Sequence, residues 1–250
     1  MTLPASFFVR PFAHRALHDR KAGRVENSLA SIKAAVAAGY GIEIDLQMSS
    51  DGHPMVFHDD LLDRLTAEQG RVNARNRAEL EKIALIDDVG TIPSLETVLA
   101  TVAGKVPMLI EIKDQDGEMG PNVGPLEQAT CDLLAAYTGD VALMSFNPHS
   151  VAACRNFAPQ IPRGITTSAY EGVFWPEVPA PRRDELREIP DYARVGACFI
   201  SHESTDLDRP RVAALKAAGA HIFCWTIRSA EEERQARKIV DNVTFEGYLA

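Results

Sequence analysis

The sequence lacks the long apolar runs that carry a chain across a membrane. None of its 250 residues lies in an uninterrupted apolar stretch approaching ~18 residues, so we expect no membrane-spanning helix. The opening segment, Met1–Arg10, has no basic region followed by a full apolar region, and we therefore expect no signal peptide.

Positive charge is also scarce. The chain has 26 Lys and Arg against 35 Asp and Glu, a formal net charge of −9. This imbalance disfavours nucleic acid or an anionic lipid surface as a partner. It leaves room for a small phosphorylated ligand, because one local cluster of cations can hold a single phosphate. We expect a small-molecule partner, and the sequence leaves the oligomeric state open.

Cysteine is sparse and scattered. The four cysteines, Cys131, Cys154, Cys198 and Cys224, form no CxxC pair, which argues against a zinc site. Two of them lie in apolar runs, where a free thiol behaves as a small buried hydrophobe. Free thiols are typical of a reducing compartment, and we expect a cytoplasmic location.

Glycine-rich phosphate loops are missing as well. There is no Gly-x4-Gly-Lys-Ser/Thr loop, which disfavours a kinase. The first apolar run leads into Ala13-His14-Arg15-Ala16, not the Gly-rich turn of an open dinucleotide-binding sheet. The composition, with 46% hydrophobic and 24% charged residues, is that of a globular chain. We expect residues 1–250 to form one domain.

Short apolar runs alternate with helical patterns along most of the chain. The runs predict buried parallel strands at Phe7–Arg15, Gly41–Gln47, Val106–Lys113, Val141–Phe146, Arg163–Ser168, Ala197–His202, His221–Ile227 and Val240–Gly247. Helical spacing predicts helices at Asn27–Ala38, Ser94–Ala103, Gly124–Ala136, Pro148–Phe157, Pro210–Ala218 and Ser229–Ile239. Eight strands with helices between most of them predict an α/β fold, the (β/α)8 TIM barrel.

One polar segment interrupts this alternation after the second predicted strand. Asp51-Gly52 is a turn signal before a short apolar run, and polar sequence then continues to about Gly90. We interpret about residues 50–90 as an insertion on the face of the barrel where the strands end.

Charged residues recur where the predicted strands end, and in a barrel these ends meet at one mouth. Glu43 and Asp45 share one face of the second strand, and Glu111 and Lys113 share one face of the third. Three converging carboxylates repel one another unless a cation lies between them, and hard divalent cations prefer oxygen ligands. The pattern predicts one Mg²⁺ or Ca²⁺ ion. Two alternatives stay open: Lys113 pairs with the acids, or the acids face solvent.

Two histidines also follow predicted strands, His14 in the first and His58 in the insertion. Histidine titrates near neutral pH, so such a pair can serve as acid and base. Arg15 offers a planar fork for phosphate oxygens, or else a salt bridge to Glu26 or Asp45. Trp225 is either a ligand-facing wall or part of the core. Together these residues favour phosphodiester cleavage.

Six short motifs, in this order, resemble the glycerophosphodiester phosphodiesterase family: His14-Arg15, Glu26-Asn27-Ser28, Glu43-x-Asp45, Asp51-Gly52, His58-Asp59 and Glu111-x-Lys113. The likeness continues more loosely through Ser145-Phe146 and Trp225-Thr226. It implies a (β/α)8 barrel, a divalent cation, and hydrolysis of glycerophosphodiesters to glycerol 3-phosphate and an alcohol.

The resemblance also implies a role for each matching residue. When the family's roles are carried over by position, Glu43, Asp45 and Glu111 would bind the metal, and His14 and His58 would be the acid–base pair. Arg15 and Lys113 would bind the phosphate, and Phe146 and Trp225 would line the pocket for the glycerol or head group. Glu26 and Asn27 would lie behind the site, with Asn27 capping the first helix. One histidine would deprotonate the neighbouring glycerol hydroxyl, which attacks phosphorus to give a cyclic phosphate, and the other would protonate the departing alcohol.

Two positions depart from the family pattern. Ala16 stands where the family usually has Gly, and because Ala adopts positive φ with difficulty, we expect a differently shaped first loop. The chain end reads Thr244-Phe245-Glu246-Gly247 instead of Thr-Asp-x-Pro, so Glu246 replaces the Asp with a longer side chain.

Three other functions are weighed against this one. The first is a lysophospholipid- or sphingomyelin-type phosphodiesterase that releases a cyclic phosphate. It needs an exposed apolar rim, for which the insertion supplies only Leu61, Leu62 and Leu65, so a water-soluble diester is favoured. The second is a barrel that binds a phosphorylated ligand without turnover. The third, a structural domain, is disfavoured because ionisable strand ends cost stability unless they are used.

Overall fold

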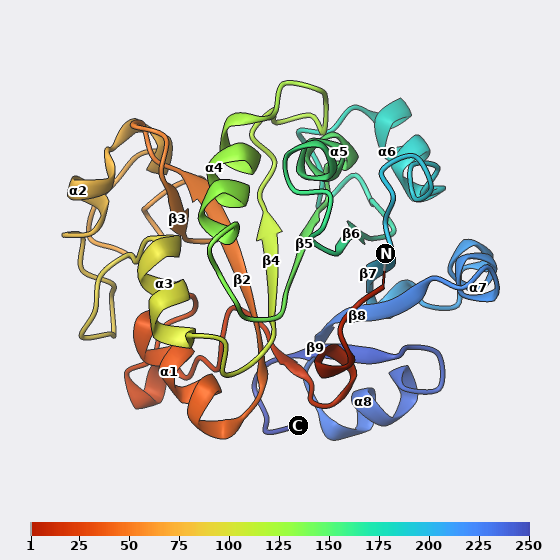
Figure 1. The fold of residues 1–250 in the computed structure, drawn as a ribbon, viewed down its shortest axis with the longest axis horizontal. Coiled ribbons are helices and arrows are strands. Elements are labelled where there is room, and N and C mark those ends of the chain that lie inside the picture. The colour runs from red at the N-terminus through yellow and green to blue at the C-terminus, as the bar shows by residue number, and fades with distance from the viewer. Residues whose placement is uncertain (1) are drawn as a thin grey trace.

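Eight parallel strands close into a barrel in the computed structural model, which describes residues 2–250 (Figure 1). They are β1 (Phe12–Ala13), β2 (Gly41–Met48), β4 (Met108–Ile112), β5 (Val141–Ser145), β6 (Arg163–Thr167), β7 (Phe199–Glu203), β8 (His221–Ile227) and β9 (Asn242–Phe245). Neighbours pair in the order β1-β9-β8-β7-β6-β5-β4-β2, and β1 pairs with β2 to close the ring. The predicted (β/α)8 TIM barrel is confirmed.

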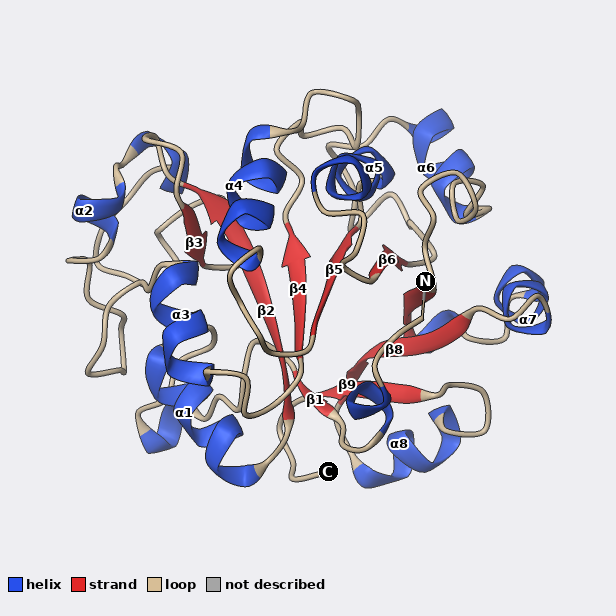
Figure 2. Ribbon diagram, viewed as in Figure 1, coloured by secondary structure: helices blue, strands red, loops and turns tan. Residues whose placement is uncertain are grey.

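Helices cover the outside of the barrel (Figure 2). They are α1 (Leu29–Ala38), α3 (Leu95–Val102), α4 (Pro125–Leu134), α5 (Pro148–Phe157), α6 (Ala180–Arg187), α7 (Pro210–Ala217) and α8 (Ala230–Ala236). The short helix α2 (Arg77–Leu80) lies in the insertion, and there are short 3-10 turns η1 (Ala5–Phe8), η2 (Arg20–Ala22), η3 (Val72–Ala74) and η4 (Ser204–Asp206). The prediction for α5 matches at both ends, because Asn147 caps it and Pro148 opens its first turn. Within residues 2–250, no helix is both long enough and apolar enough to cross a bilayer.

The first predicted strand is wrong in its extent. Ala5–Phe8 forms a 3-10 turn, and only Phe12–Ala13 pairs as β1. Phe7 is fully buried in one cluster with Phe12, Phe199 and Phe223. This apolar run therefore fills the barrel interior and adds little to its wall. The packing is close: a Cβ on Gly41 would lie 2.7 Å from the Phe12 ring, so a side chain at this position would displace that ring.

The interrupting segment folds against the carboxyl end of β2. Its strand β3 (Pro54–Val56) pairs antiparallel with β2, placing Met55 opposite Gln47. The segment has an apolar cluster of its own: Val25, Met55, Phe57, Leu62, Leu65, Val72, Leu80, Ile83, Leu85 and Ile92. Leu62 and Leu65 are buried there, so of the three insertion leucines only Leu61 is exposed. The cluster fixes the chain on both sides of His58 against the barrel mouth.

Candidate active site

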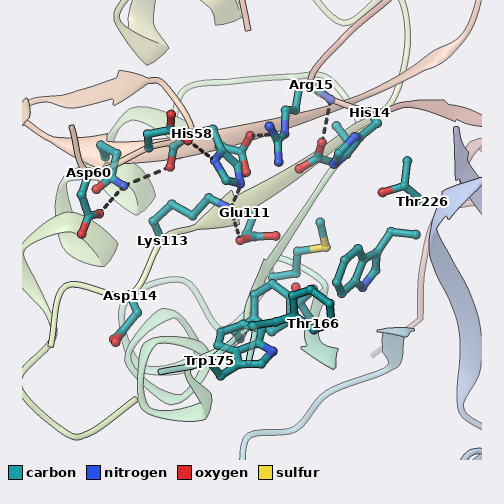
Figure 3. A pocket seen from close by; sticks show the side chains of 18 of the residues that line it. His14, Arg15, His58, Asp60, Glu111, Lys113, Asp114, Thr166, Trp175 and Thr226 are labelled. Atoms are coloured by element: carbon teal, nitrogen blue, oxygen red, sulfur yellow. Dashed lines mark hydrogen bonds and ion pairs between the residues drawn. The ribbon is translucent and has the colours of Figure 1, made fainter. Parts of the chain in front are cut away.

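The carboxyl ends of the strands surround a cavity of about 790 Å³ (Figure 3). Nearly all of the residues predicted for the site line it: His14, Arg15, Glu43, Asp45, His58, Glu111, Lys113, Phe146 and Trp225. Glu26 and Asn27 lie behind this lining and contact Arg15 and Asp45, respectively. The barrel thus brings the predicted residues together from widely separated parts of the sequence.

Three carboxylates form a buried cluster on adjacent strands. Asp45 on β2 lies in register with Glu111 on β4, and Glu43 precedes Asp45 by two residues on the same face. One carboxylate oxygen from each lies within 4.8 Å of the others. Burial, together with the charges of Asp45 and Glu111, raises the pKa of Glu43 well above its usual value. An all-oxygen donor set that resists carrying three negative charges fits a hard divalent cation.

Lys113 follows directly after β4 and pairs with two of these acids. Its Nζ lies 2.7 Å from Oδ1 of Asp45 and 2.6 Å from Oε1 of Glu111. Burial alone would lower the pKa of Lys113, but the charges of Asp45 and Glu111 raise it above the usual value. The three acids are buried, so the alternative in which they face solvent is wrong, and Lys113 pairs with two of them.

Arg15 connects the first loop to the acidic cluster. Its Nη1 donates to Oε1 of Glu26 at 2.8 Å, its Nε lies 3.6 Å from Oδ2 of Asp45, and its backbone N–H donates to Oε2 of Glu43 at 2.8 Å. Ala16 adopts a φ of 65°, so the expectation that Ala would avoid positive φ here is wrong. Its N–H donates to the backbone carbonyls of Ala13 and Glu43, and these bonds hold the conformation.

Asn27 lies behind the site, as expected, but it does not cap α1. Ser28 caps α1, accepting a hydrogen bond from the N–H of Ser31 at its own Oγ. Asn27 has a left-handed backbone, and its Nδ2 donates to Oδ2 of Asp45 at 2.9 Å. The prediction that Asn27 caps the helix is therefore wrong, because its side chain is turned inward to orient a carboxylate.

Each predicted acid–base histidine is held by a carboxylate. Nδ1 of His14 lies 2.6 Å from Oε2 of Glu246, and Nδ1 of His58 lies 2.6 Å from Oδ1 of Asp59. A neutral ring that donates from Nδ1 presents the Nε2 lone pair to a substrate. Burial and the charge of Arg15 lower the pKa of His14, although Glu246 opposes them. Glu246 thus contacts His14 from one residue after the place that Asp has in the family's Thr-Asp-x-Pro ending.

Arg64 is a site residue that sequence reasoning missed. It lies in the insertion and donates twice to Asp59, from Nε at 2.6 Å and from Nη2 at 3.0 Å. It also donates twice to Glu26, at 2.9 and 2.7 Å. Burial alone would raise the pKa of Glu26, but Arg64 and Arg15 lower it to about 2. The sequence signal that could have indicated Arg64 was its positive charge within the insertion, six positions after His58.

Aromatic side chains form the wall across the cavity from these charged groups (Figure 3). The ring centroids of Phe146 and Trp175 lie 4.8 Å apart, and those of Phe146 and Trp225 lie 5.5 Å apart at 86°. The indole Nε1 of Trp225 donates to the Ser201 carbonyl, which fixes the ring. Trp225 therefore faces the cavity, as one of its two interpretations expected, and Trp175 is an addition from the loop before α6.

A family model for the glycerophosphoryl diester phosphodiesterase family matches residues 14–245, which span all of this geometry except Glu246. The chain belongs to the glycerophosphoryl diester phosphodiesterase family. The resemblance carried by the six motifs is thereby confirmed, and so is the expectation of a phosphodiesterase enzyme. This family generally depends on a divalent metal, and the chain has a buried acidic cluster of Glu43, Asp45 and Glu111.

Two curated relatives cover most of this family member. A glycerophosphodiester phosphodiesterase of Caldanaerobacter subterraneus is 27% identical over 229 residues, covering 87% of each chain. YhdW of Bacillus subtilis is 27% identical over 217 residues, covering 82% of this chain and 81% of the relative. The similarity therefore spans the barrel as a whole and is not confined to the motifs.

Solved structures of the glycerophosphoryl diester phosphodiesterase family share the fold. An Oleispira antarctica phosphodiesterase in complex with the product sn-glycerol-3-phosphate superposes with a TM-score of 0.77 at 23% identity, covering 96% of this chain and 94% of that one. A glycerophosphodiester phosphodiesterase from Agrobacterium tumefaciens superposes with a TM-score of 0.69 at 21% identity, covering 98% and 96%. At these identities the likeness establishes the fold.

Proposed function

We propose that this phosphodiesterase hydrolyses glycerophosphodiesters to glycerol 3-phosphate and an alcohol, using one divalent cation and two histidines. The observation that carries the proposal is the pair of carboxylate-held imidazoles, His14 and His58, in one cavity with the acidic cluster. Arg15 lies between the two histidines in Figure 3. The glycerol 3-phosphate bound to the Oleispira antarctica phosphodiesterase supports the product assignment.

Glu43, Asp45 and Glu111 would hold the cation, and their oxygen donors suit Mg²⁺ or Ca²⁺. When bound, the ion supplies charge neutralisation for a phosphate oxygen and acidifies a hydroxyl group near it. Asn27 and the backbone N–H of Arg15 orient two of these carboxylates. The guanidinium of Arg15 and the ammonium of Lys113 would bind the remaining phosphate oxygens.

The histidines would move protons in two steps. One imidazole removes the proton from the glycerol hydroxyl next to the phosphate, and that oxygen attacks phosphorus. The bond from phosphorus to the alcohol breaks as the other imidazole gives its proton to the departing oxygen. Water then opens the cyclic phosphate with the two roles exchanged. Glu246 and Asp59 hold the rings at Nδ1, so each Nε2 can face the substrate.

We also propose that the protein acts in the cytoplasm, in glycerol and lipid metabolism. Its four cysteines are free thiols, and three of them are buried. This supports a reducing compartment.

The decisive experiment is hydrolysis of glycerophosphocholine and glycerophosphoethanolamine, with and without excess chelator. Phosphorus NMR separates glycerol 3-phosphate from a released cyclic phosphate. We expect glycerol 3-phosphate to form with Mg²⁺ or Ca²⁺ and turnover to stop in chelator. Accumulation of a cyclic phosphate as the only product would favour the lysophospholipid- or sphingomyelin-type phosphodiesterase. Cation binding without turnover of any diester would favour a ligand-binding barrel.

A further inference from the structure

The cavity is larger and more apolar than a glycerol phosphate requires. Its volume of about 790 Å³ is in the range of sites that bind drug-sized ligands, roughly 300–1,000 Å³. Its apolar lining residues are Leu61, Met119, Met144, Phe146, Phe174, Trp175, Pro176, Val178 and Trp225. A polyhydroxylated group gains little from such a surface, because apolar side chains offer it no hydrogen bonds.

The apolar wall continues outward along the loop between β6 and α6. Tyr170 and Val178 are buried and anchor the two ends of this loop. Trp175 packs between the rings of Phe146 and Tyr170, and Arg183 donates to its carbonyl and to that of Val178. The loop is therefore held in place by defined contacts, and it carries the wall out to the cavity mouth.

The two residues before Trp175 in this loop expose large apolar side chains to solvent. Val173 is 77% exposed and Phe174 is 73% exposed, and Phe174 lines the same cavity. Leu61, from the insertion, also lines it and is 46% exposed. Exposed large apolar side chains at the mouth of a polar site are typical of a binding surface. The β6–α6 loop thus adds exposed apolar side chains at the mouth, whereas of the three insertion leucines only Leu61 is exposed.

We propose that this apolar wall is a subsite for a single aliphatic chain carried by the phosphodiester substrate. The proposal rests on the proposed function, because it places the substrate phosphate at Arg15 and Lys113 in the same cavity. The chain can belong to the glycerol or to the leaving alcohol, since the wall recognises the same chemistry in both. In either case the net reaction is hydrolysis: the oxygen of water bonds to phosphorus, the bond from phosphorus to the leaving oxygen breaks, and a proton from water ends on the leaving alcohol.

A fluorescence titration tests the subsite without relying on turnover. The chain has two tryptophans, Trp175 and Trp225, and both line this cavity, so their emission reports on it. The probes are octylphosphocholine and glycerophosphocholine, both below any micelle concentration. We expect octylphosphocholine to bind at least about tenfold more tightly, since each methylene in an apolar pocket adds affinity. Equal or weaker binding of octylphosphocholine would overturn the proposal.

Matched variants locate the effect. Phe174→Ser should weaken octylphosphocholine binding by about fivefold to tenfold. Phe157→Ser removes another exposed phenylalanine, on α5 and outside the cavity lining, and should leave binding unchanged. If Phe174→Ser instead reduces only sedimentation with phosphatidylglycerol vesicles, the rim is a membrane-contact surface and the subsite is wrong.

Kinetics then distinguish where the chain is carried and separate the two proposals. The substrates are glycerophosphocholine, octanoyl-lysophosphatidylcholine with the chain on glycerol, and glycerophospho-N-octanoylethanolamine with the chain on the alcohol. We expect kcat/KM to be about tenfold higher for one chain-bearing substrate than for glycerophosphocholine. Hydrolysis of glycerophosphocholine with no gain from either chain overturns the subsite and leaves the proposed function standing. If none of the three diesters is cleaved, the proposed function fails, and the subsite is then decided by the fluorescence titration.

Discussion

The barrel strands and the insertion both place charged side chains in one cavity, but they hold them differently. Glu43, Asp45 and Glu111 extend from paired strands and are at most 6% exposed. Asp59 and Arg64 stand on irregular backbone in the insertion, and their side chains are 24% and 45% exposed. The strand groups are fixed by the sheet, whereas the insertion groups are fixed by one another.

This difference separates two tasks. A cation site needs ligands whose spacing does not change, and neighbouring strands in register provide it. Proton transfer needs an imidazole that can approach a substrate, and a partly exposed segment at the mouth can supply that. Substituting a strand carboxylate should therefore weaken cation binding, whereas substituting a residue that carries or orients an imidazole should lower kcat.

The largest expected effect is on turnover when either imidazole is removed. His14→Ala and His58→Ala should each lower kcat on glycerophosphocholine by ~10² to 10⁴, because each ring is proposed to carry a proton. Calorimetry of Mg²⁺ or Ca²⁺ binding should show little change in either variant. Near-full activity in both would remove the histidines from the mechanism.

Asp45→Asn should do the converse and weaken the cation site itself. Asp45 belongs to the acidic cluster and also contacts Lys113, Arg15 and Asn27. Losing a residue that only hydrogen-bonds to a metal ligand typically lowers metal affinity by about 10-fold to 100-fold. Asp45 is proposed as a ligand itself, so we expect cation affinity to fall by more than about 100-fold. Calorimetric titration measures this affinity directly. An unchanged affinity would place the ion elsewhere.

Arg64→Gln sharpens the comparison on the insertion side. The Arg64 guanidinium holds Asp59, which in turn contacts Nδ1 of His58, so without it the imidazole loses its fixed orientation. We expect kcat to fall by about tenfold, with a smaller change in KM. Arg64→Lys should restore only part of it, because an ammonium cannot bind two carboxylates bidentately. Arg71→Gln is the matched control, since among residues 2–250 Arg71 forms an ion pair only with exposed Asp60 in the same insertion. Equal losses in both variants would show a general effect of charge.

The smallest effect is on stability in acid. The pKa of Glu26 is about 2, against an ordinary value of 4.5. A lowered carboxyl pKa stabilises the fold above pH 4.5, and this contribution disappears as the pH falls toward 2. Wild type should have a free energy of unfolding about 3 kcal/mol higher than Glu26→Gln near pH 6, and this difference should disappear between pH 4.5 and 2. Urea unfolding at several pH values measures it; a constant gap would contradict the assignment.

Periodicity was enough to predict the barrel and the residues at its mouth. Glu43, Asp45, Glu111 and Lys113 interrupt apolar strands, and parallel strands of a closed barrel place such interruptions side by side. The same rule fails for Phe7, because an apolar run can fill a barrel as well as form its wall, and composition does not distinguish the two.

Contacts made by irregular backbone could not be predicted from the sequence. The contacts of Arg64 depend on how the loop after β3 folds back, which local spacing does not determine. The bond from Asn27 to Asp45 depends in the same way on the loop before α1, although the family motif already placed Asn27 behind the site. Helix α6 was missed because only Leu186 in it is buried, so it has almost no apolar period. The apolar rim near Phe174 was missed with it, since it lies in the loop that leads into that helix.

The central claim is that Glu43, Asp45 and Glu111 hold one divalent ion in the cavity shared by His14 and His58. Diffraction from crystals soaked in Mn²⁺, an electron-rich substitute for Mg²⁺, locates that ion through its anomalous signal. We predict one strong peak among these three carboxylates. A peak at another place, or none at a concentration that supports turnover, would contradict it.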